Sequence, residues 1–400
     1  MSGPLNGVRI LDLTTVLMGP YATQILGELG ADVIKVEPPQ GDTVRGIGPM
    51  RHPGMGAIFL HANRGKRSIV LDLKQPEGRQ ALLDLARTAD VLIYNVRPQA
   101  MARLGLSYAE VAEANPRIVY VGLFGYGQDG PYAAKPAYDD LIQGAVAIPT
   151  LFAASTGGEP RYVPATMVDR TVGLHAVYAV TAALFHRERT GQGQAVDVPM
   201  FETMTHFVQG DHMGGATFEP VAGPTGYPRL LAPQRRPYRT SDGHICALIY
   251  NDKQWRSFFE LIGRPDILDS APRFADMDSR TRHIDELYGF VAEHLATRTT
   301  AEWMEALTRA DIPVMRLHTL DSLLEDPHLT ATGFFQVVEH PREGPIRSMA
   351  VPTRWSGSPP AVERQAPALG EHSAEVLREA GYDDATIAAL AERGVIREAG

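Results

Sequence analysis

The carboxylate of Asp169 is the first candidate for chemistry in this chain of 400 residues. It lies in the segment Thr166-Met-Val-Asp-Arg-Thr-Val-Gly173, just ahead of a long apolar stretch, and the chain has few other nucleophile candidates. A carboxylate in such a position can attack an electrophile and form a covalent intermediate. The alternative interpretation is that Asp169 caps a helix, and the residue taken alone favours that alternative.

A second candidate feature is the positive charge between residues 61 and 103. Basic residues outnumber acidic ones there, although the chain as a whole carries a net charge of −9. Several lie beside predicted strand ends, in Asn63-Arg-Gly-Lys66, in Asn95-Val-Arg97 and at Arg103. Ligands bind at the carboxyl ends of parallel strands, and arginine and lysine suit phosphorylated ligands. The charge pattern alone fits a phosphorylated ligand and a solvated surface equally well.

The elements that must position these residues alternate between strand and helix. Apolar strands are predicted at 8–13, 32–37, 68–73, 91–96 and 117–124, and helices at 20–30 and 76–87. Ser107-Tyr-Ala-Glu110 forms a capping box at the start of a further short helix. Strand–helix–strand units of this length predict an α/β fold with a Rossmann-like parallel sheet in a large domain. The apolar run from Val172 to Phe185 is predicted to be a buried helix.

The character of the sequence changes after residue 205. Residues 206–237 contain a stretch rich in Gly, Pro and Arg without a sustained period, so we expect a linker or an active-site loop. Asp242-Gly243 predicts the turn of a β-hairpin, and helices are expected near 255–262 and 284–297. Residues 238–327 are therefore predicted to form a smaller α+β domain.

Several classes of function are excluded by missing or incomplete motifs. Gly125-Tyr-Gly-Gln-Asp-Gly130 has the spacing of a dinucleotide fingerprint, but Pro131 prevents the helix that the fingerprint requires. Neither a Gly-x-Ser-x-Gly elbow nor a His-Glu-x-x-His zinc motif occurs in the sequence. The net negative charge disfavours nucleic acid, no apolar run is long enough to span a bilayer, and the single Cys246 fits a reducing compartment. We therefore expect a cytoplasmic protein without a metal, a nucleic-acid partner or a membrane partner.

Short motifs in a fixed order resemble the class III CoA transferases, also called the formyl-CoA transferase or carnitine CoA transferase family (CaiB/BaiF type). The resemblance covers essentially the whole chain. It is carried by Leu11-Asp-Leu13 with Gly19-Pro20, Leu29-Gly-Ala-Asp-Val-Ile-Lys-Val-Glu37 with Gly41-Asp42, Asn63-Arg-Gly-Lys-Arg-Ser68 with Leu71-Asp-Leu-Lys74, Asn95-Val-Arg-Pro98 with Arg103-Leu-Gly105, Gly125-Tyr-Gly-Gln-x-Gly-Pro131, Tyr138-Asp139, Asp169, Thr190-Gly-x-Gly-Gln194 and Leu369-Gly-Glu-His372.

The resemblance implies an enzyme, an acyl-CoA:carboxylate CoA transferase. It would move CoA from an acyl-CoA, with succinyl-CoA as a candidate donor, to a free carboxylic acid. Asp169 would attack the thioester to give a mixed anhydride, and the released thiolate would then form an aspartyl-CoA thioester on the same residue. An ionised carboxylate needs no general base for this attack. The resemblance also implies CoA as a substrate, no tightly bound cofactor, and an interlocked homodimer.

Carried over residue by residue, the resemblance assigns CoA binding to Val16, Leu17, Met18, Leu71, Asp72, Leu73, Lys74, Asn95, Val96, Arg97, Arg103, Lys135 and Tyr138. It makes residues 1–205 the first part of a large CoA-binding domain, which residues 328–400 complete. The sequence departs from the family pattern at Pro38-Pro39, where some members have a basic residue. Gly223-Pro-Thr-Gly226 also lacks the glycine run of the formyl-CoA enzymes, so formyl transfer to oxalate is not expected.

Two other functions stay open. The α-methylacyl-CoA racemases, which look similar, place a histidine where this chain has Tyr138, and a tyrosine with a pKa near 10 is a poor base at neutral pH. A non-catalytic CoA-binding protein is the second alternative, and Asp169 argues against it because binding alone does not require this carboxylate. Arg229, Arg235 and Arg236 would hold a second carboxylate of a dicarboxylic acid, or they are solvated loop charges. The acids that are exchanged are left open.

Overall fold

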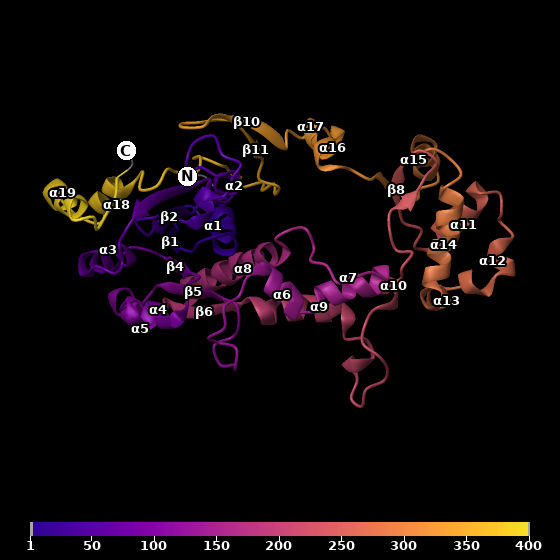
Figure 1. Ribbon diagram of the computed structural model, residues 1–400, viewed down its shortest axis with the longest axis horizontal. Helices are drawn as coiled ribbons and strands as arrows, with labels where there is room; N and C mark the ends of the chain where they lie inside the picture. The colour runs from indigo at the N-terminus through magenta and orange to yellow at the C-terminus, as the bar shows by residue number, and fades with distance from the viewer. Residues whose placement is uncertain (1–2, 399–400) are drawn as a thin grey trace. The chain divides into compact units, whose positions relative to one another are not determined.

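The computed structural model describes residues 3–398, apart from the side chain of Asp269. The chain divides into two compact units (Figure 1). Unit 1 comprises the chain up to Val146, Pro164–His206 and the chain from His328 onward. Unit 2 comprises Ala147–Val163 and Phe207–Pro327.

Unit 1 is built on a parallel sheet of six strands in the order β3-β2-β1-β4-β5-β6. The large parallel sheet predicted from the sequence is therefore confirmed. The order reverses between β1 and β4, which is the kind of switch point at which open α/β sheets bind ligands. The strands are β1 (Arg9–Leu13), β2 (Asp32–Glu37), β3 (Lys66–Val70), β4 (Val91–Tyr94), β5 (Val119–Phe124) and β6 (Gln194–Pro199).

Helices cover the sheet of unit 1. Pro76 opens α3 and the Ser107 capping box opens α5, both as predicted. The helices of unit 1 are α1 (Met18–Glu28), α2 (Ala57–Asn63), α3 (Pro76–Ala86), α4 (Pro98–Arg103), α5 (Tyr108–Ala114), α6 (Asp139–Ala145), α8 (Met167–Thr190), α18 (Ser373–Glu379) and α19 (Asp384–Glu392). Smaller elements are the 3-10 turn η1 (Thr43–Gly46), α17 (Pro327–Ala331) at its boundary and the antiparallel pair β10 (Phe335–His340) and β11 (Gly344–Met349).

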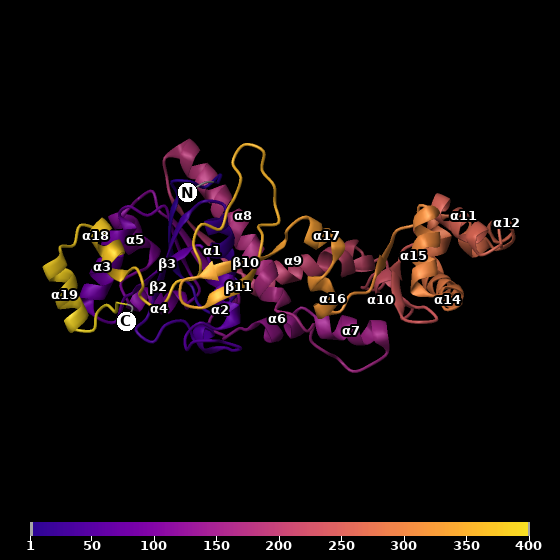
Figure 2. The same cartoon turned by 90° about the horizontal axis from the view of Figure 1, so that it is seen from above.

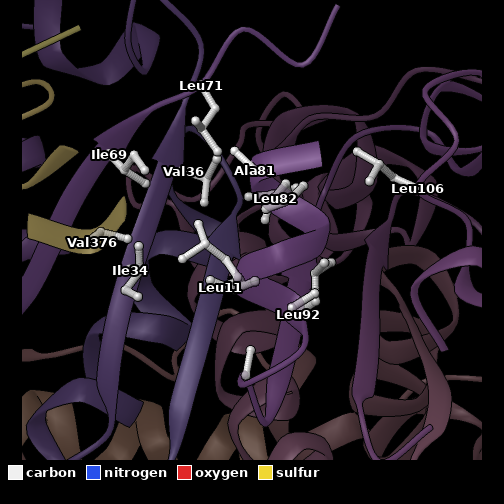
Figure 3. Packing of buried hydrophobic residues seen from close by; sticks show 14 of the residues in the cluster. Leu11, Ile34, Val36, Ile69, Leu71, Ala81, Leu82, Leu92, Leu106 and Val376 are labelled. Carbon is white, nitrogen blue, oxygen red and sulfur yellow. The ribbon is translucent and has the colours of Figure 1, made fainter. Parts of the chain in front are cut away.

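The main core of unit 1 lies between one face of the sheet and α3, α5, α18 and α19. Leu11, Ile34 and Leu92 stand at matching positions of neighbouring strands and are fully buried (Figure 3). Leu82 of α3 and Val376 of α18 belong to the same cluster. In Figure 1 and Figure 2 the helices α18 and α19 lie beside α3, so the end of the chain completes a core that its beginning starts.

Unit 2 combines a small antiparallel sheet with helices around an aromatic core. The turn predicted at Asp242-Gly243 is confirmed, because Arg239 pairs with His244 across it. Trp255, Phe258 and Phe274 are buried together in the core. The elements are α7 (Ile148–Thr156), η2 (Gly214–Thr217), α10 (Pro228–Leu231), β7 (Tyr238–Arg239), β8 (His244–Ala247), α11 (Asp252–Leu261), α12 (Ile267–Ser270), η3 (Pro272–Phe274), α13 (Met277–Arg282), α14 (Ile284–Leu295), α15 (Thr300–Arg309), β9 (Val314–Arg316) and α16 (Leu320–Leu324); α9 (Met200–His212) runs from unit 1 into unit 2.

The long helix α8 differs from its prediction. The sequence predicted a buried helix over residues 172–185, whereas α8 extends over Met167–Thr190 and leaves Leu174, Tyr178 and Phe185 more than half exposed. An apolar residue type does not fix burial, since much of any protein surface is apolar. No helix in the described part of the chain has the length and hydropathy needed to cross a membrane.

Candidate active site

A pocket of about 280 Å³ opens at the carboxyl edge of the unit 1 sheet, beside the switch point between β1 and β4. The loops that follow β1, β4 and β5 line it, together with the first turn of α8. This is the position that the fold favours for a ligand. The pocket brings together the predicted site residues Val16, Leu17, Met18, Asn95, Val96, Arg97, Lys135, Tyr138 and Asp169.

The other predicted CoA contacts do not line this pocket. They are Leu71, Asp72, Leu73, Lys74 and Arg103. The first four directly follow β3 and so lie at the same edge of the sheet, but Leu71 is buried in the core while Lys74 is exposed. Arg103 is exposed in the last turn of α4. Their assignment to CoA binding stays a prediction.

For the basic segment Asn63-Arg-Gly-Lys66, the sequence left a phosphorylated ligand and a solvated surface equally open, but its charged side chains are buried within unit 1. Lys66 lies inside β3 and is fully buried; its Nζ donates to Asp12 Oδ2 at 3.0 Å and to Asn63 Oδ1 at 2.8 Å. Arg64 and Arg67 are also buried and form ion pairs with carboxylates of unit 1. A charge removed from water requires a partner inside the protein, and these three have one, so neither a phosphorylated ligand nor a solvated surface accounts for them.

The loop between β1 and α1 holds a strained residue at the pocket. Val16 has a φ of 70°, a left-handed conformation that β-branched residues rarely adopt. Asn95 holds both backbone groups of the preceding residue, Thr15. Its Oδ1 accepts from Thr15 N at 3.0 Å, and its Nδ2 donates to Thr15 O at 2.9 Å. Strain held by surrounding side chains is typical of functional sites. Asn95 therefore shapes the pocket through the main chain.

Asp42 and Lys35 secure the same loop from within unit 1. Asp42 Oδ1 accepts from Val16 N at 3.1 Å, and Lys35 Nζ donates to Asp42 Oδ2 and to Thr14 O, both at 2.9 Å. Both side chains are fully buried. The sequence analysis gave neither residue a role. A signal was present, because a lysine in the middle of an apolar strand is tolerated only with a partner.

Asp169 lies in the first turn of α8, where Asp139 takes over the capping function. Thr166 is the N-cap residue, and the N–H of Asp169 donates to Asp139 Oδ2 at 2.9 Å. Gln143 donates to the other oxygen of Asp139 at 2.6 Å and so orients it. No donor in the described part of the chain contacts the carboxylate of Asp169. The alternative that Asp169 is an ordinary capping residue is therefore wrong.

The environment of Asp169 makes its carboxylate unusually hard to ionise. Burial raises the pKa of Asp169 to about 7, the nearby negative charge of Asp139 adds to this effect, and the Arg170 guanidinium opposes it. Arg170 itself stacks over the ring of Tyr21 at 4.4 Å. An ionised carboxylate that accepts no hydrogen bond from the protein has its electron pairs available for attack on an electrophile.

The other charged side chains that line the pocket are positive. Arg97 and Lys135 line it and are exposed, and neither forms an ion pair within the described residues; Lys135 Nζ lies 3.7 Å from the centre of the Tyr132 ring. Asp169 is the only carboxylate among the described lining residues, and no histidine is among them. The arrangement therefore combines one unpartnered carboxylate with two cations that can meet an anionic ligand.

Comparison with known proteins gives consistent matches. The family model for CoA-transferase family III matches residues 5–373. The chain is 33% identical over 388 residues to a succinate–glutarate CoA-transferase of Agrobacterium fabrum, covering 94% of this chain and 95% of the relative. It is 32% identical over 421 residues to a formyl-CoA:oxalate CoA-transferase of Streptomyces avermitilis, covering 99% and 100%. The crystal structure of Rv3272 from Mycobacterium tuberculosis superposes with a TM-score of 0.80 at 32% identity, covering 93% and 99%.

Proposed function

The chain belongs to CoA-transferase family III and is an enzyme, and on that premise we propose that it exchanges CoA between an acyl-CoA and a free carboxylic acid through covalent intermediates on Asp169. The observation that carries this proposal is the carboxylate of Asp169, which lines the pocket without a hydrogen-bond donor or an ion-pair partner among the described residues. A residue that served only the structure would not be kept in this state, because a half-buried charge without a partner destabilises the fold.

The proposed reaction is the one that the resemblance to the family implies, and the position of this carboxylate at the pocket supports it. An oxygen of Asp169 attacks the thioester carbonyl, the carbon–sulfur bond breaks, and a mixed anhydride and CoA thiolate result. The thiolate then attacks the Asp169 carbonyl carbon, which releases the first acid and leaves an aspartyl-CoA thioester. The acceptor carboxylate then attacks the aspartyl-CoA thioester and gives a second mixed anhydride and CoA thiolate. The thiolate attacks the acyl carbon of this anhydride, which releases the new acyl-CoA and regenerates Asp169. Each step forms one bond and breaks one, so the enzyme must mainly position the reactants and stabilise developing oxyanions.

The chain's own residues suit these tasks. Arg97 and Lys135 would bind the phosphates of CoA, because neither has a carboxylate partner among the described residues. The N–H groups of Leu17 and Met18, which open α1, would donate hydrogen bonds to the developing oxyanion. We propose that Leu71 to Lys74 and Arg103 extend the CoA site beyond the pocket, since CoA is longer than the pocket itself.

The substrates that we propose to test first are short dicarboxylic acids. The relatives that match the chain have succinate, glutarate and oxalate in their names, and arginines are available in this chain for a second carboxylate. Succinyl-CoA is the proposed donor. We keep formyl-CoA and oxalate as a test pair, although Gly223-Pro-Thr-Gly226 lacks the glycine run of the formyl-CoA enzymes.

We also propose an interlocked homodimer in the cytoplasm. Residues 1–205 and 328–400 would form the large CoA-binding domain, 206–237 the linker or active-site loop, and 238–327 the small domain. Three apolar side chains of α8 are exposed, namely Leu174, Tyr178 and Phe185. Their exposure supports the proposal that a second chain packs against them. The single cysteine supports a reducing compartment.

The test is a transfer assay combined with trapping of the intermediate. The protein is incubated with succinyl-CoA and a panel of acids, and the new thioesters are identified by mass spectrometry. Hydroxylamine should convert the acylated Asp169 into a hydroxamate in the peptide that contains it. Asp169→Asn should lose both transfer and hydroxamate, whereas Asp140→Asn, which removes an exposed neighbouring carboxylate, should retain both. Transfer by Asp169→Asn would remove Asp169 from the mechanism.

The racemase alternative has its own measurement. A racemase exchanges the α-proton of a methylacyl-CoA with solvent deuterium in the absence of an acceptor acid. The pocket lining offers Tyr138 but no histidine. We therefore expect no exchange. Exchange without an acceptor acid would replace transfer by isomerisation as the proposed function.

A further inference from the structure

Unit 2 contains a second pocket, of about 430 Å³, with arginines as its only charged lining residues. They are Arg229, Arg235 and Arg236. The remaining walls come from the sheet of unit 2, the loop before β9, and Tyr288 of α14. No aspartate or glutamate is among the lining residues, so the positive charge of this pocket is not balanced from within.

Arg229 is the best-fixed of the three. It is half-buried, its Nε donates to the Tyr288 hydroxyl at 3.0 Å, and its guanidinium lies 5.5 Å from the centre of the Tyr250 ring. In the described part of the chain, no acceptor lies within hydrogen-bonding distance of its two terminal nitrogens, and no carboxylate pairs with it. A half-buried cation without a counter-ion is costly, and a fixed guanidinium fork matches a carboxylate in bidentate geometry.

Arg235 and Arg236 are exposed, and hydrogen bonds hold the main chain at this segment. The N–H of Gln234 donates to Asp285 Oδ1 at 2.8 Å, and the N–H of Arg235 donates to Ala232 O at 2.9 Å. Neither arginine forms an ion pair with a described residue; Arg236 only donates to Gln234 Oε1, at 3.1 Å. These two charges therefore raise the local concentration of anions at the pocket.

The rest of the lining is apolar. Leu248, Pro313, Val314 and Met315 form part of it, and Leu248 and Met315 are exposed. A bare phosphate or sulfate would use the arginines but not this apolar surface. A carbon chain that ends in a carboxylate would use both, because burying its methylene groups is favourable.

We propose that this pocket is a binding site for an organic carboxylate, whose anionic end pairs with Arg229 and whose carbon chain lies against Leu248 and Met315. The site is additional to the pocket at Asp169, and it does not rest on the transfer reaction proposed there. The acid that binds is either the free acid of the reaction or a separate acid that acts on the enzyme.

Cys246 gives this proposal a site-specific test, because it lines the pocket and is the only cysteine of the chain. The residue is partly exposed. In the full-length protein, we expect glutarate to slow alkylation of Cys246 by iodoacetamide, whereas dimethyl glutarate and inorganic phosphate should not. In Arg229→Gln, half-protection should require about a tenfold higher glutarate concentration, because a charge-assisted hydrogen bond is lost.

The control is Arg256→Gln, which changes an exposed arginine of α11 that does not line the pocket; its protection should match that of the unchanged protein. If Arg229→Gln does not fold, the double variant Arg235→Gln/Arg236→Gln changes only exposed side chains and should also weaken protection. Absence of protection by glutarate, equal protection by phosphate, or equal protection in Arg229→Gln would overturn the proposal.

A kinetic measurement then separates the two sources of the acid. If the pocket binds the free acid of the reaction, Arg229→Gln should raise the KM for that acid about tenfold and leave the KM for the acyl-CoA unchanged. If it binds a separate acid, both KM values should stay unchanged in the absence of that acid. The alkylation assay requires no turnover, so a failure of the proposed transferase function would be recognised separately.

Discussion

The raised pKa of Asp169 predicts that this residue destabilises the folded protein at neutral pH. Its folded pKa of about 7 lies above its ordinary value of 3.8, so the folded state binds this proton more tightly than the unfolded chain does. The resulting stabilisation is complete at low pH and is lost as the pH rises from about 3.8 to about 7. Asp169→Asn, which keeps the shape but never ionises, should therefore be more stable than the unchanged protein above this range.

The size of the effect follows from the same two values. One pKa unit corresponds to about 1.4 kcal/mol, so full ionisation of Asp169 costs at most about 4 kcal/mol. The carboxylate lines a pocket that water can enter, which reduces this to about 2 kcal/mol. Between about pH 5 and about pH 8, the advantage of Asp169→Asn should grow by about 0.5 to 1 kcal/mol.

Urea unfolding of both proteins at several pH values measures this directly. Other titrating groups affect both proteins alike, so the difference between the two free energies of unfolding isolates Asp169. Asp140→Asn is the control and should change stability by less than about 0.5 kcal/mol, because its side chain is exposed. A difference that does not grow with pH would refute the account of Asp169 as a desolvated carboxylate.

Three further predictions concern the groups around Asp169. Asp139→Asn keeps an acceptor for the N–H of Asp169 but removes the negative charge that raises the pKa of Asp169. The acidic limb of the pH profile of kcat/KM should therefore move to lower pH. A limb that does not move would contradict the coupling between the two carboxylates. Arg97→Gln should raise the KM for the acyl-CoA about tenfold, whereas Arg354→Gln, an exposed arginine elsewhere in unit 1, should not, and equal KM values would remove Arg97 from the CoA site. Lys35→Met leaves Asp42 buried without its cation and should lower the free energy of unfolding by about 3 to 5 kcal/mol; the double variant Lys35→Met/Asp42→Asn should recover part of this loss, and a loss that is simply additive would argue against the pair.

Strands β1 to β5 of the unit 1 sheet could be predicted because they are buried, whereas β6, which is partly exposed, was not predicted. Such buried strands are continuous apolar runs, and the helices between them are marked by Pro76 and by the Ser107 capping box. The boundaries were less accurate. β3 begins at Lys66, two residues before the predicted start, because a charged residue inside a strand does not look like part of an apolar run.

Part of the candidate site could not be predicted, because it depends on contacts between distant segments. Lys66 donates a hydrogen bond to Asp12, which is 54 positions away in the sequence, and the N–H of Asp169 donates to Asp139, which is 30 positions away. A local sequence pattern shows that a lysine or an aspartate is present, but it does not show whether the fold brings a hydrogen-bond or ion-pair partner to that side chain. The pocket residues Val16 to Met18, which follow β1, were assigned from the resemblance to the family, and the structure places their loop beside the loop after the neighbouring strand β4.

The buried Asp12 and the half-buried Asp169 show how partners decide the ionisation of a carboxylate. Burial alone would raise the pKa of both. At Asp12, Lys66 and Lys35 together with two threonine hydroxyls outweigh burial and lower the pKa to about 2, so this carboxylate is ionised, satisfied and unreactive. At Asp169, burial is reinforced by Asp139 and no donor reaches the side chain, so the pKa rises to about 7. In the proposed reaction, the missing donors that reduce stability would also leave the oxygen free to attack a thioester, so stability and reactivity at Asp169 would have one physical origin.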